Sequence, residues 1–374
     1  MSELAERLIA ENLKTKNPVL DLGYCGLDGS EKLLDKLEEY THLETLIFSN
    51  YWQPYESILT DQADDWPYSQ NKSNNRNDLK HIPKNLPISL KKLVLTTDAY
   101  FPDEEEEDLE YETWEEEDIK PTPIEYADFS PLAALANLEV LQFGNYKSAD
   151  ISFVKNLKLL KVLNLEFNKI QDISPLKALK QLEVLDISGN YIQDISLIEG
   201  LKQLKVVILA DNEIQDMSPL QSLPNLQYLD VSHTKLLNTT PLARLETLQH
   251  FHYRYSKLED IGFLKNLTNL KVLGLGGPSI SLEDNQIQDI SPLQHLTSLE
   301  RLDLNRNPVT NHEFLGNLTN LRELLIGKTQ SKNLSFLQNL RSLQVLDLSG
   351  NKPLLSQYEH LKYLTSTMGT KFLM

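Results

Sequence analysis

The sequence contains a single cysteine, Cys25, among its 374 residues, so no disulfide can form within the chain. This scarcity favours a reducing compartment. No stretch approaches the roughly 18 consecutive apolar residues that a transmembrane helix requires. The opening Met1-Ser-Glu-Leu-Ala-Glu-Arg is acidic where a secretory signal has a basic start followed by an apolar run. We therefore expect a cytoplasmic protein with no membrane segment.

Basic charge is also scarce, because 36 Lys and Arg face 54 Asp and Glu, which gives a net charge of −18. Twelve of the acids lie in residues 103–118, which contain no Lys or Arg. A basic footprint for nucleic acid is therefore absent, and an anionic membrane surface would repel the chain. The acidic segment, with Leu109, Tyr111 and Trp114 interleaved, could dock a basic partner. A solvated, mobile segment is the alternative.

Leucine recurs at a fixed interval through the middle of the chain. Seven leucines follow one another at steps of 22 residues: Leu138, Leu160, Leu182, Leu204, Leu226, Leu248 and Leu270. Further copies begin at Asn17 (degenerate), Leu43, Leu90, Leu299, Leu321 and Leu343, for about 13 coils in all. A period of this length, with the pattern L-x-x-L-x-L-x-x-N-x-[IL], is typical of a leucine-rich repeat solenoid.

Each coil has a predictable conformation, which is clearest in the copy that starts at Leu160. The alternation of Leu163 and Leu165 predicts a short strand with inward leucines, and stacked strands about 4.8 Å apart form a concave parallel sheet. Asn168 is expected to bond to the backbone at the turn. Ser174 suits a helix N-cap and Pro175 the first helical position, so the convex side should carry 3₁₀ or short α-helices. The fold class is thus an α/β solenoid, a leucine-rich repeat horseshoe.

The expected organisation is a solenoid at residues 17–351 between two helical caps, at residues 1–16 and 352–374. Ends of a solenoid expose core and must be covered, and both segments space their apolar residues three or four apart. Departures from the 22-residue step indicate insertions at about residues 51–76 and 99–124 and a short one at 276–283. All three leave after the strand of their repeat, so they should emerge along one edge.

The phrase N-x-I-x-D-I-S-P-L-x-x-L, found at Asn168 to Leu179 and at Asn285 to Leu296, resembles the 22-residue class of leucine-rich repeats. That class includes bacterial internalins and regulatory subunits of protein phosphatase. The opening from Leu4 to Leu27 is similar to bacterial repeat domains that precede Roc-COR GTPases. These resemblances imply the fold and a bacterial binding protein, and they name no ligand, because the matching residues are core residues.

The concave face should carry the side chains at offsets +2, +4, +6 and +7 from the first leucine of each coil. In most coils the residues at these offsets indicate no particular ligand, whereas three central coils have aromatic and charged residues there. The candidate partner-binding residues are Tyr228, Asp230, His233, His250, His252, Arg254, Tyr255, Arg301, Asp303 and Arg306. Aromatic and Arg side chains gathered at one place are typical of an interface hot spot. Random drift on a solvated face is the alternative.

The insertions offer a secondary site, since they contain all three tryptophans: Trp52, Trp66 and Trp114. The alternative is that these rings only pin the loops. Zinc is not indicated, because His233, His250 and His252 lack a cysteine or carboxylate partner to complete the geometry. Gly327-Lys328-Thr329 lacks the first glycine of a phosphate loop. We expect no metal, no cofactor and no enzymatic activity.

The function that these patterns favour is non-catalytic recognition of a partner protein on the concave face. A rigid stack of coils is preorganised, so binding costs little ordering entropy. The alternative is a regulatory or sensor arm acting on a separate GTPase or phosphatase. The sequence does not identify the partner.

Overall fold

The computed structural model describes residues 3–50, 69, 71, 75–96, 128–234, 236–277, 284–331, 333–351 and 371–373. These residues form two compact units, 1–184 and 185–374. The two long insertions and most of the expected C-terminal cap lie largely outside the described residues. No helix in the described part of the chain is long and apolar enough to cross a membrane.

Every strand in the described residues is three residues long, and the strands follow one another coil by coil. The strands are β1 Val19–Asp21, β2 Thr45–Ile47, β3 Lys92–Val94, β4 Val140–Gln142, β5 Val162–Asn164, β6 Val184–Asp186, β7 Val206–Ile208, β8 Tyr228–Asp230, β9 His250–His252, β10 Val272–Gly274, β11 Arg301–Asp303, β12 Glu323–Leu325, β13 Val345–Asp347 and β14 Lys371–Leu373. Within each unit, neighbouring strands pair in parallel and in sequence order. The first residues of paired strands face each other, as Tyr228 faces His250.

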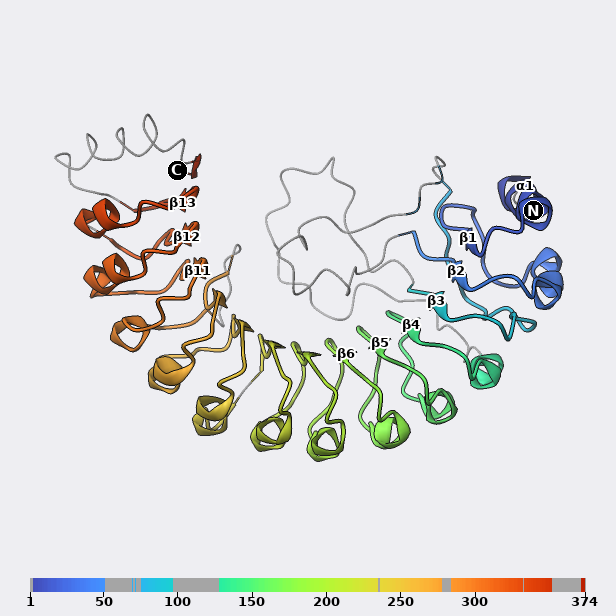
Figure 1. Ribbon diagram of the computed structural model, residues 1–374, viewed down its shortest axis with the longest axis horizontal. Coiled ribbons are helices and arrows are strands. Elements are labelled where there is room, and N and C mark those ends of the chain that lie inside the picture. Colours follow the sequence, from blue (N-terminus) through green and yellow to red (C-terminus); the bar gives the residue numbers. More distant parts are fainter. Residues whose placement is uncertain are drawn as a thin grey trace, which may run out of the picture. The chain divides into compact units, whose positions relative to one another are not determined.

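The opposite side of the coils carries short helices. An α-helix, α1 Glu3–Thr15, precedes β1, and the other helices among the described residues are 3₁₀ helices. These are η1 Lys32–Glu39, η3 Ser130–Ala134, η4 Ser152–Asn156, η5 Ser174–Ala178, η6 Ser196–Gly200, η7 Ser218–Ser222, η8 Thr240–Arg244, η9 Gly262–Asn266, η10 Ser291–Leu293, η11 His312–Asn317 and η12 Ser335–Asn339. In Figure 1, strands stack on one side of each unit and helices on the other. The predicted fold class is confirmed.

The aliphatic residues of each coil fill the space between the strand and the helix. Leu163 and Leu165, the two leucines that alternate along the β5 coil, are fully buried, as are Leu176 and Leu179 from its helical side. Burying one such side chain stabilises the fold by about 1.5–3 kcal/mol. The same positions are filled in every coil, so the core is continuous along each unit.

The repeated asparagine links several coils to their predecessors, as the sequence predicts. Asn168 donates its amide protons to the carbonyl oxygens of Phe143 and Leu165, both at 3.0 Å, and its Oδ1 accepts from the amides of Tyr146 and Ser148, both at 3.1 Å. Equivalent bonds come from Asn77, Asn212, Asn285, Asn307 and Asn351. The polar atoms at the turn are therefore satisfied by side chains although they are buried.

The prediction that Ser caps the 3₁₀ helices is wrong. By its backbone conformation, Ile173 is the N-cap residue of η5, and its side chain makes no capping hydrogen bond. Instead, Asp172 Oδ1 accepts from the amide of Ser174 at 2.8 Å, and Oδ2 accepts from its hydroxyl at 2.9 Å. An aspartate two residues ahead reaches the first amide of the turn, which the Ser side chain itself cannot do. The same bond lowers the pKa of Asp194 and Asp289.

The first expected cap contains a helix, whereas the described part of the second contains a strand. Helix α1 packs beside β1, and Asn12 within it donates to the carbonyl oxygens of Asn17 and Val19, both at 3.0 Å. At the other end, Lys371–Leu373 is not helical but pairs in parallel with β13. The backbone of β13 is thus bonded by a further strand, and residues 352–370 lie outside the described part.

Candidate functional site

The candidate residues lie on or just after β8, β9 and β11 of the second unit, and β10 stands between β9 and β11. Directly paired residues across this ladder are Asp230, His252, Gly274 and Asp303 in one row. Tyr228, His250, Val272 and Arg301 form the row before it. The residues at offsets +3 and +5 of these coils, such as Phe251 and Tyr253, point into the core and are at most 2% exposed. The alternation therefore places the candidate side chains on the outer face of the sheet.

Aromatic rings meet across β8 and β9. The Tyr228 ring is stacked on the His250 imidazole with centroids 5.8 Å apart, and it lies 5.4 Å from the His252 ring at a tilt of 47°. His250 and His252 are only 4% and 9% exposed, so they are less accessible than their place on the face suggests. Burial raises the pKa of the Tyr228 hydroxyl well above its ordinary value, with the nearby Asp230 carboxylate adding to the effect.

Three glycines in and after β10 provide the space into which neighbouring side chains fold. A Cβ on Gly274 would collide with the imidazole of His252, and it would lie 2.8 Å from Nη2 of Arg254. A Cβ on Gly277 would collide with the Tyr255 ring. The side chains of the β9 coil therefore lie across the bare backbone of the β10 coil. A sequence signal for this arrangement exists, because glycine occupies offsets +4, +6 and +7 of one coil and bulky residues occupy the same offsets of the coil before it. The prediction of the site from the sequence did not use this signal.

Two polar atoms in this cluster lack a partner. Nδ1 of His252 and Nε of Arg254 are buried, and neither makes a hydrogen bond to any described residue. Burial lowers the pKa of His252 well below its ordinary value, and the positive charges of Arg254 and Arg301 act in the same direction. The imidazole is thus neutral at pH 7. Buried unpaired polar atoms are costly, and each one in a folded protein calls for an explanation.

The two aspartates of the candidate set also hold the ends of their strands. Asp230 Oδ1 accepts from the amide of Ser232 at 2.8 Å, and Asp303 Oδ1 accepts from the amide of Asn305 at 3.0 Å. Burial raises the pKa of both carboxyl groups, against the opposing effect of these bonds and of Arg254. Coils with bland faces use the same bond, for example Asp186 to the amide of Ser188. Part of the role of these aspartates is therefore structural.

Offset +7 has a left-handed backbone in most coils, including those that carry candidate residues. His233, Tyr255 and Arg306 have φ of 55°, 50° and 63°, whereas Gly189 and Gly350 occupy the same offset elsewhere. This conformation costs a residue with a Cβ about 1–2 kcal/mol. His233 also contacts Asp211 of the preceding coil and meets the Tyr255 ring edge-on at 6.4 Å. Strain of this kind is common at functional positions.

The structure brings most of the candidates close to one another. Ring contacts join Tyr228 to His250 and His252, and a separate ring contact joins His233 to Tyr255. Arg301 begins β11 and pairs with Glu323 of β12, with 3.3 Å between Nε and Oε2. The secondary candidates Trp52, Trp66 and Trp114 and the acidic segment 103–118 lie outside the described residues.

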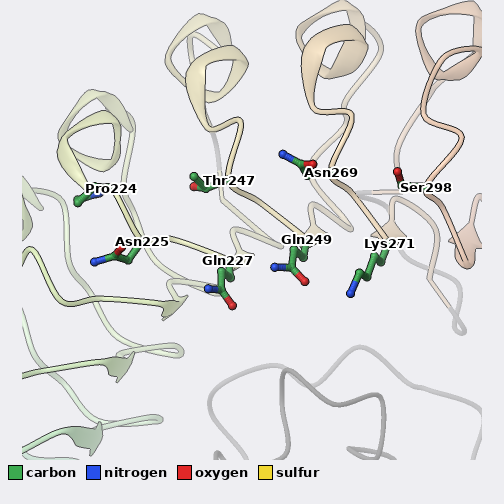
Figure 2. Close-up of a pocket in the computed structure, with 8 residues that line it drawn as sticks. All are labelled: Pro224, Asn225, Gln227, Thr247, Gln249, Asn269, Lys271 and Ser298. Carbon is green, nitrogen blue, oxygen red and sulfur yellow. The ribbon is translucent and has the colours of Figure 1, made fainter.

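A polar depression lies at the amino ends of β8, β9 and β10, apart from the cluster. Its volume is about 540 Å³. Figure 2 shows the side chains of Gln227, Gln249 and Lys271 in a row, with Thr247 and Asn269 between the row and the helices. No group of three or more His, Cys, Asp or Glu that could hold a metal ion occurs among the described residues.

Comparisons with known proteins agree on the repeat. Models described as Leucine Rich repeats (2 copies) match residues 158–200 and 279–317, and a model described as Leucine rich repeat matches residues 180–236. No curated protein sequence matches the chain.

Solved structures of repeat proteins are similar in fold. An LRR protein of Leptospira interrogans, LIC12759, is 20% identical over 98% of both chains, with a TM-score of 0.57. Internalin C2 of Listeria monocytogenes is 34% identical over 52% of this chain and 83% of its own, with a TM-score of 0.47. The internalin InlF of the same organism is 28% identical over 65% and 82%, with a TM-score of 0.48. The family models thus match leucine-rich repeats in these segments of the chain, and the Leptospira protein shares its solenoid fold.

Proposed function

We propose that this protein recognises a partner protein, without catalysis, on the outer sheet face formed by the β8 to β11 coils. Leucine-rich repeat proteins generally mediate protein–protein interactions, and stacked repeats present an extended preorganised surface. The observation that carries the assignment to this face is the cluster of Tyr228, His250, His252, Arg254 and Tyr255. It combines rings, a guanidinium and two unpaired buried polar atoms at neighbouring coils.

The chemistry of this cluster is that of an interface anchor. Tyr and Arg are enriched among residues that dominate binding energy. Arg254 lies within the electrostatic reach of Asp230 and Asp303, while its Nε has no acceptor among the described residues. A partner group that accepts a hydrogen bond would complete the geometry of Arg254. For the location we propose the cytoplasm, because the one cysteine is free and buried.

The test compares three forms of the full chain as bait in extracts of its native cell, with bound proteins identified by mass spectrometry. The first is wild type, and the second carries His250→Ser, His252→Ser, Arg254→Ser and Tyr255→Gly. The third is a matched control with Lys177→Ser and Lys265→Ser on the helical side. A partner retained by wild type and control and reduced at least tenfold on the cluster variant supports the proposal.

Equal retention by the cluster variant, with its circular dichroism spectrum and unfolding transition preserved, contradicts the assignment to this face. Reproducible turnover of a substrate that the cluster variant loses would contradict the non-catalytic part of the proposal.

A further inference from the structure

Charged side chains occupy offset +1, just before the strand, in most coils, and several of them pair between neighbouring coils. In the first unit, Lys91 Nζ lies 2.8 Å from Glu44 Oε1 and Lys161 Nζ lies 2.6 Å from Glu139 Oε2. In the second unit Arg322 Nη1 lies 3.4 Å from Glu300 Oε2. The row thus neutralises itself through contacts within the chain.

Three consecutive coils interrupt this pairing. Gln227, Gln249 and Lys271 occupy offset +1 before β8, β9 and β10. Among the described residues, neither glutamine side chain makes a hydrogen bond, and the Lys271 ammonium has no ion pair. The acid of the next coil, Glu300, pairs with Arg322 instead. The carboxamides of Gln227 and Gln249 and the ammonium of Lys271 therefore lie in neighbouring coils without a partner among the described residues.

These three side chains line the depression of about 540 Å³. Figure 2 shows them in one row, with Thr247 and Asn269 between the row and the helices. Thr247 Oγ1 donates to the carbonyl oxygen of Leu226 at 2.6 Å, and Asn269 Nδ2 donates to that of Glu246 at 2.8 Å. The wall is thus fixed by its own hydrogen bonds, while the row beneath it is free to bind.

The composition of the row selects among ligand classes. No aromatic ring lines the depression, and sequence-tolerant nucleic-acid binding relies on stacking bases on aromatic rings. A single cation is too few for an anionic polymer. A carboxamide both donates and accepts, as the peptide group does, and coils about 4.8 Å apart present one such group after another. An ammonium at the end of the row suits a carboxylate.

We propose that Gln227, Gln249 and Lys271 form a second binding site, which takes an extended peptide segment of a partner protein. The carboxamides bond to the peptide backbone, and Lys271 pairs with an Asp or Glu side chain of the segment. This site stands at the amino ends of the strands and does not depend on the cluster proposed above.

The test is a selection from a displayed library of random heptapeptides on the full wild-type chain. Peptides that also bind the Gln227→Ala, Gln249→Ala, Lys271→Ala triple variant are removed. We expect recovered peptides to share an Asp or Glu at one position. Measured by fluorescence polarisation, Lys271→Ala should weaken their binding at least tenfold and Gln249→Ala about fivefold. Gln344→Ala, at the same offset far along the row, is the matched control and should leave binding unchanged.

A charge swap gives a second readout that mere misfolding would not reproduce. Lys271→Glu should lose the acidic peptide and bind the version in which its acid is replaced by Lys. Recovery of no peptide that discriminates the triple variant overturns the proposal, as do peptides without a shared acid. Oligosaccharides that bind only when the three residues are present would overturn the peptide class. The cluster variant should bind the selected peptides normally, so failure here leaves the first proposal unaffected.

Discussion

His252 and Gly274 are directly paired residues of β9 and β10, and the imidazole of His252 occupies the space that a Cβ on residue 274 would need. The guanidinium of Arg254 lies over the same glycine, with Nη2 at 2.8 Å from that position. His252 and Arg254 can therefore take these positions only because residue 274 is a glycine.

Gly274→Ala should displace His252 and Arg254 and weaken partner capture while costing about 1–3 kcal/mol of stability, as overpacking does. Urea unfolding measures the stability and the capture assay measures the site. Gly262→Ala is the matched control, because the nearest atom to its added Cβ is Asp260 Oδ1 at 3.1 Å, on an exposed side chain. Equal capture by Gly274→Ala and wild type would contradict the link between the glycine and the cluster.

Asn168→Ala should destabilise the protein by about 2–5 kcal/mol, because it leaves several buried backbone groups without partners. The bonds lost include those to Phe143 and Leu165 and those from Tyr146 and Ser148. Chemical denaturation measures the loss. Asn225→Ala is the matched control, since the exposed Asn225 makes one bond, to the carbonyl oxygen of Lys202 at 3.2 Å. A similar small loss in both variants would show that the asparagine ladder contributes little.

The stability of the second unit should fall between pH 7 and 5.5, partly because of His252. Its folded pKa is lowered by burial, so the unfolded chain, with an ordinary His pKa near 6.5, binds the proton first. Stability is lost as pH falls through that unfolded value, with a slope of at most about 1.4 kcal/mol per pH unit for one proton.

Asp230 and Asp303 act in the opposite direction, since burial raises their folded pKa. They favour the folded state as pH falls from that raised value toward the unfolded value of about 3.9. His252→Gln should therefore make stability less dependent on pH from about pH 7 down to the lowered folded pKa of His252. Unfolding curves at half-unit steps of pH test this, and an unchanged slope in the variant would contradict it.

Lys328→Gly should raise stability by about 0.5–1 kcal/mol. Lys328 is exposed at offset +7 with φ of 56°, and glycine adopts this conformation without the cost that a Cβ adds. The matched control, Lys265→Gly, lies within η9 and should lower stability by about 0.5–1 kcal/mol. Thermal and urea unfolding compare the two, and a loss in Lys328→Gly would show that its side chain contributes more than the strain costs.

The sequence was sufficient to predict what repeats in every coil. A leucine such as Leu163 has the same surroundings in each copy, so the period alone indicates that it is buried. Asn168 and its equivalents follow for the same reason. The helix start was misjudged because Asp172 and Ser174 are both good acceptors near a turn, and only geometry decides which one reaches the amide.

The candidate site was less predictable, because it depends on differences between neighbouring coils. The frame places His250 and His252 on the outer face, but it does not indicate how far Tyr228 and Arg254 cover them. This arrangement depends on Gly274 of the next coil, because a residue without a Cβ leaves room for the side chains of His252 and Arg254. Contacts between unlike copies follow from side-chain size in three dimensions, and no single repeat contains that information.

The ladder in which Asn212 reaches back to the carbonyl oxygen of Ile187 makes the coil an interchangeable module. Removing residues 205–226, one full period, would join Leu204 to Gln227 and keep the later strands in register with the earlier ones. Extra residues within a coil are also tolerated, because Asn285 still donates to the carbonyl oxygens of Tyr253 and Leu275 although the coil from Leu270 is longer than one period. Whole coils can therefore be added or removed without redesigning the interior, and recombination within the gene can lengthen the protein in such steps.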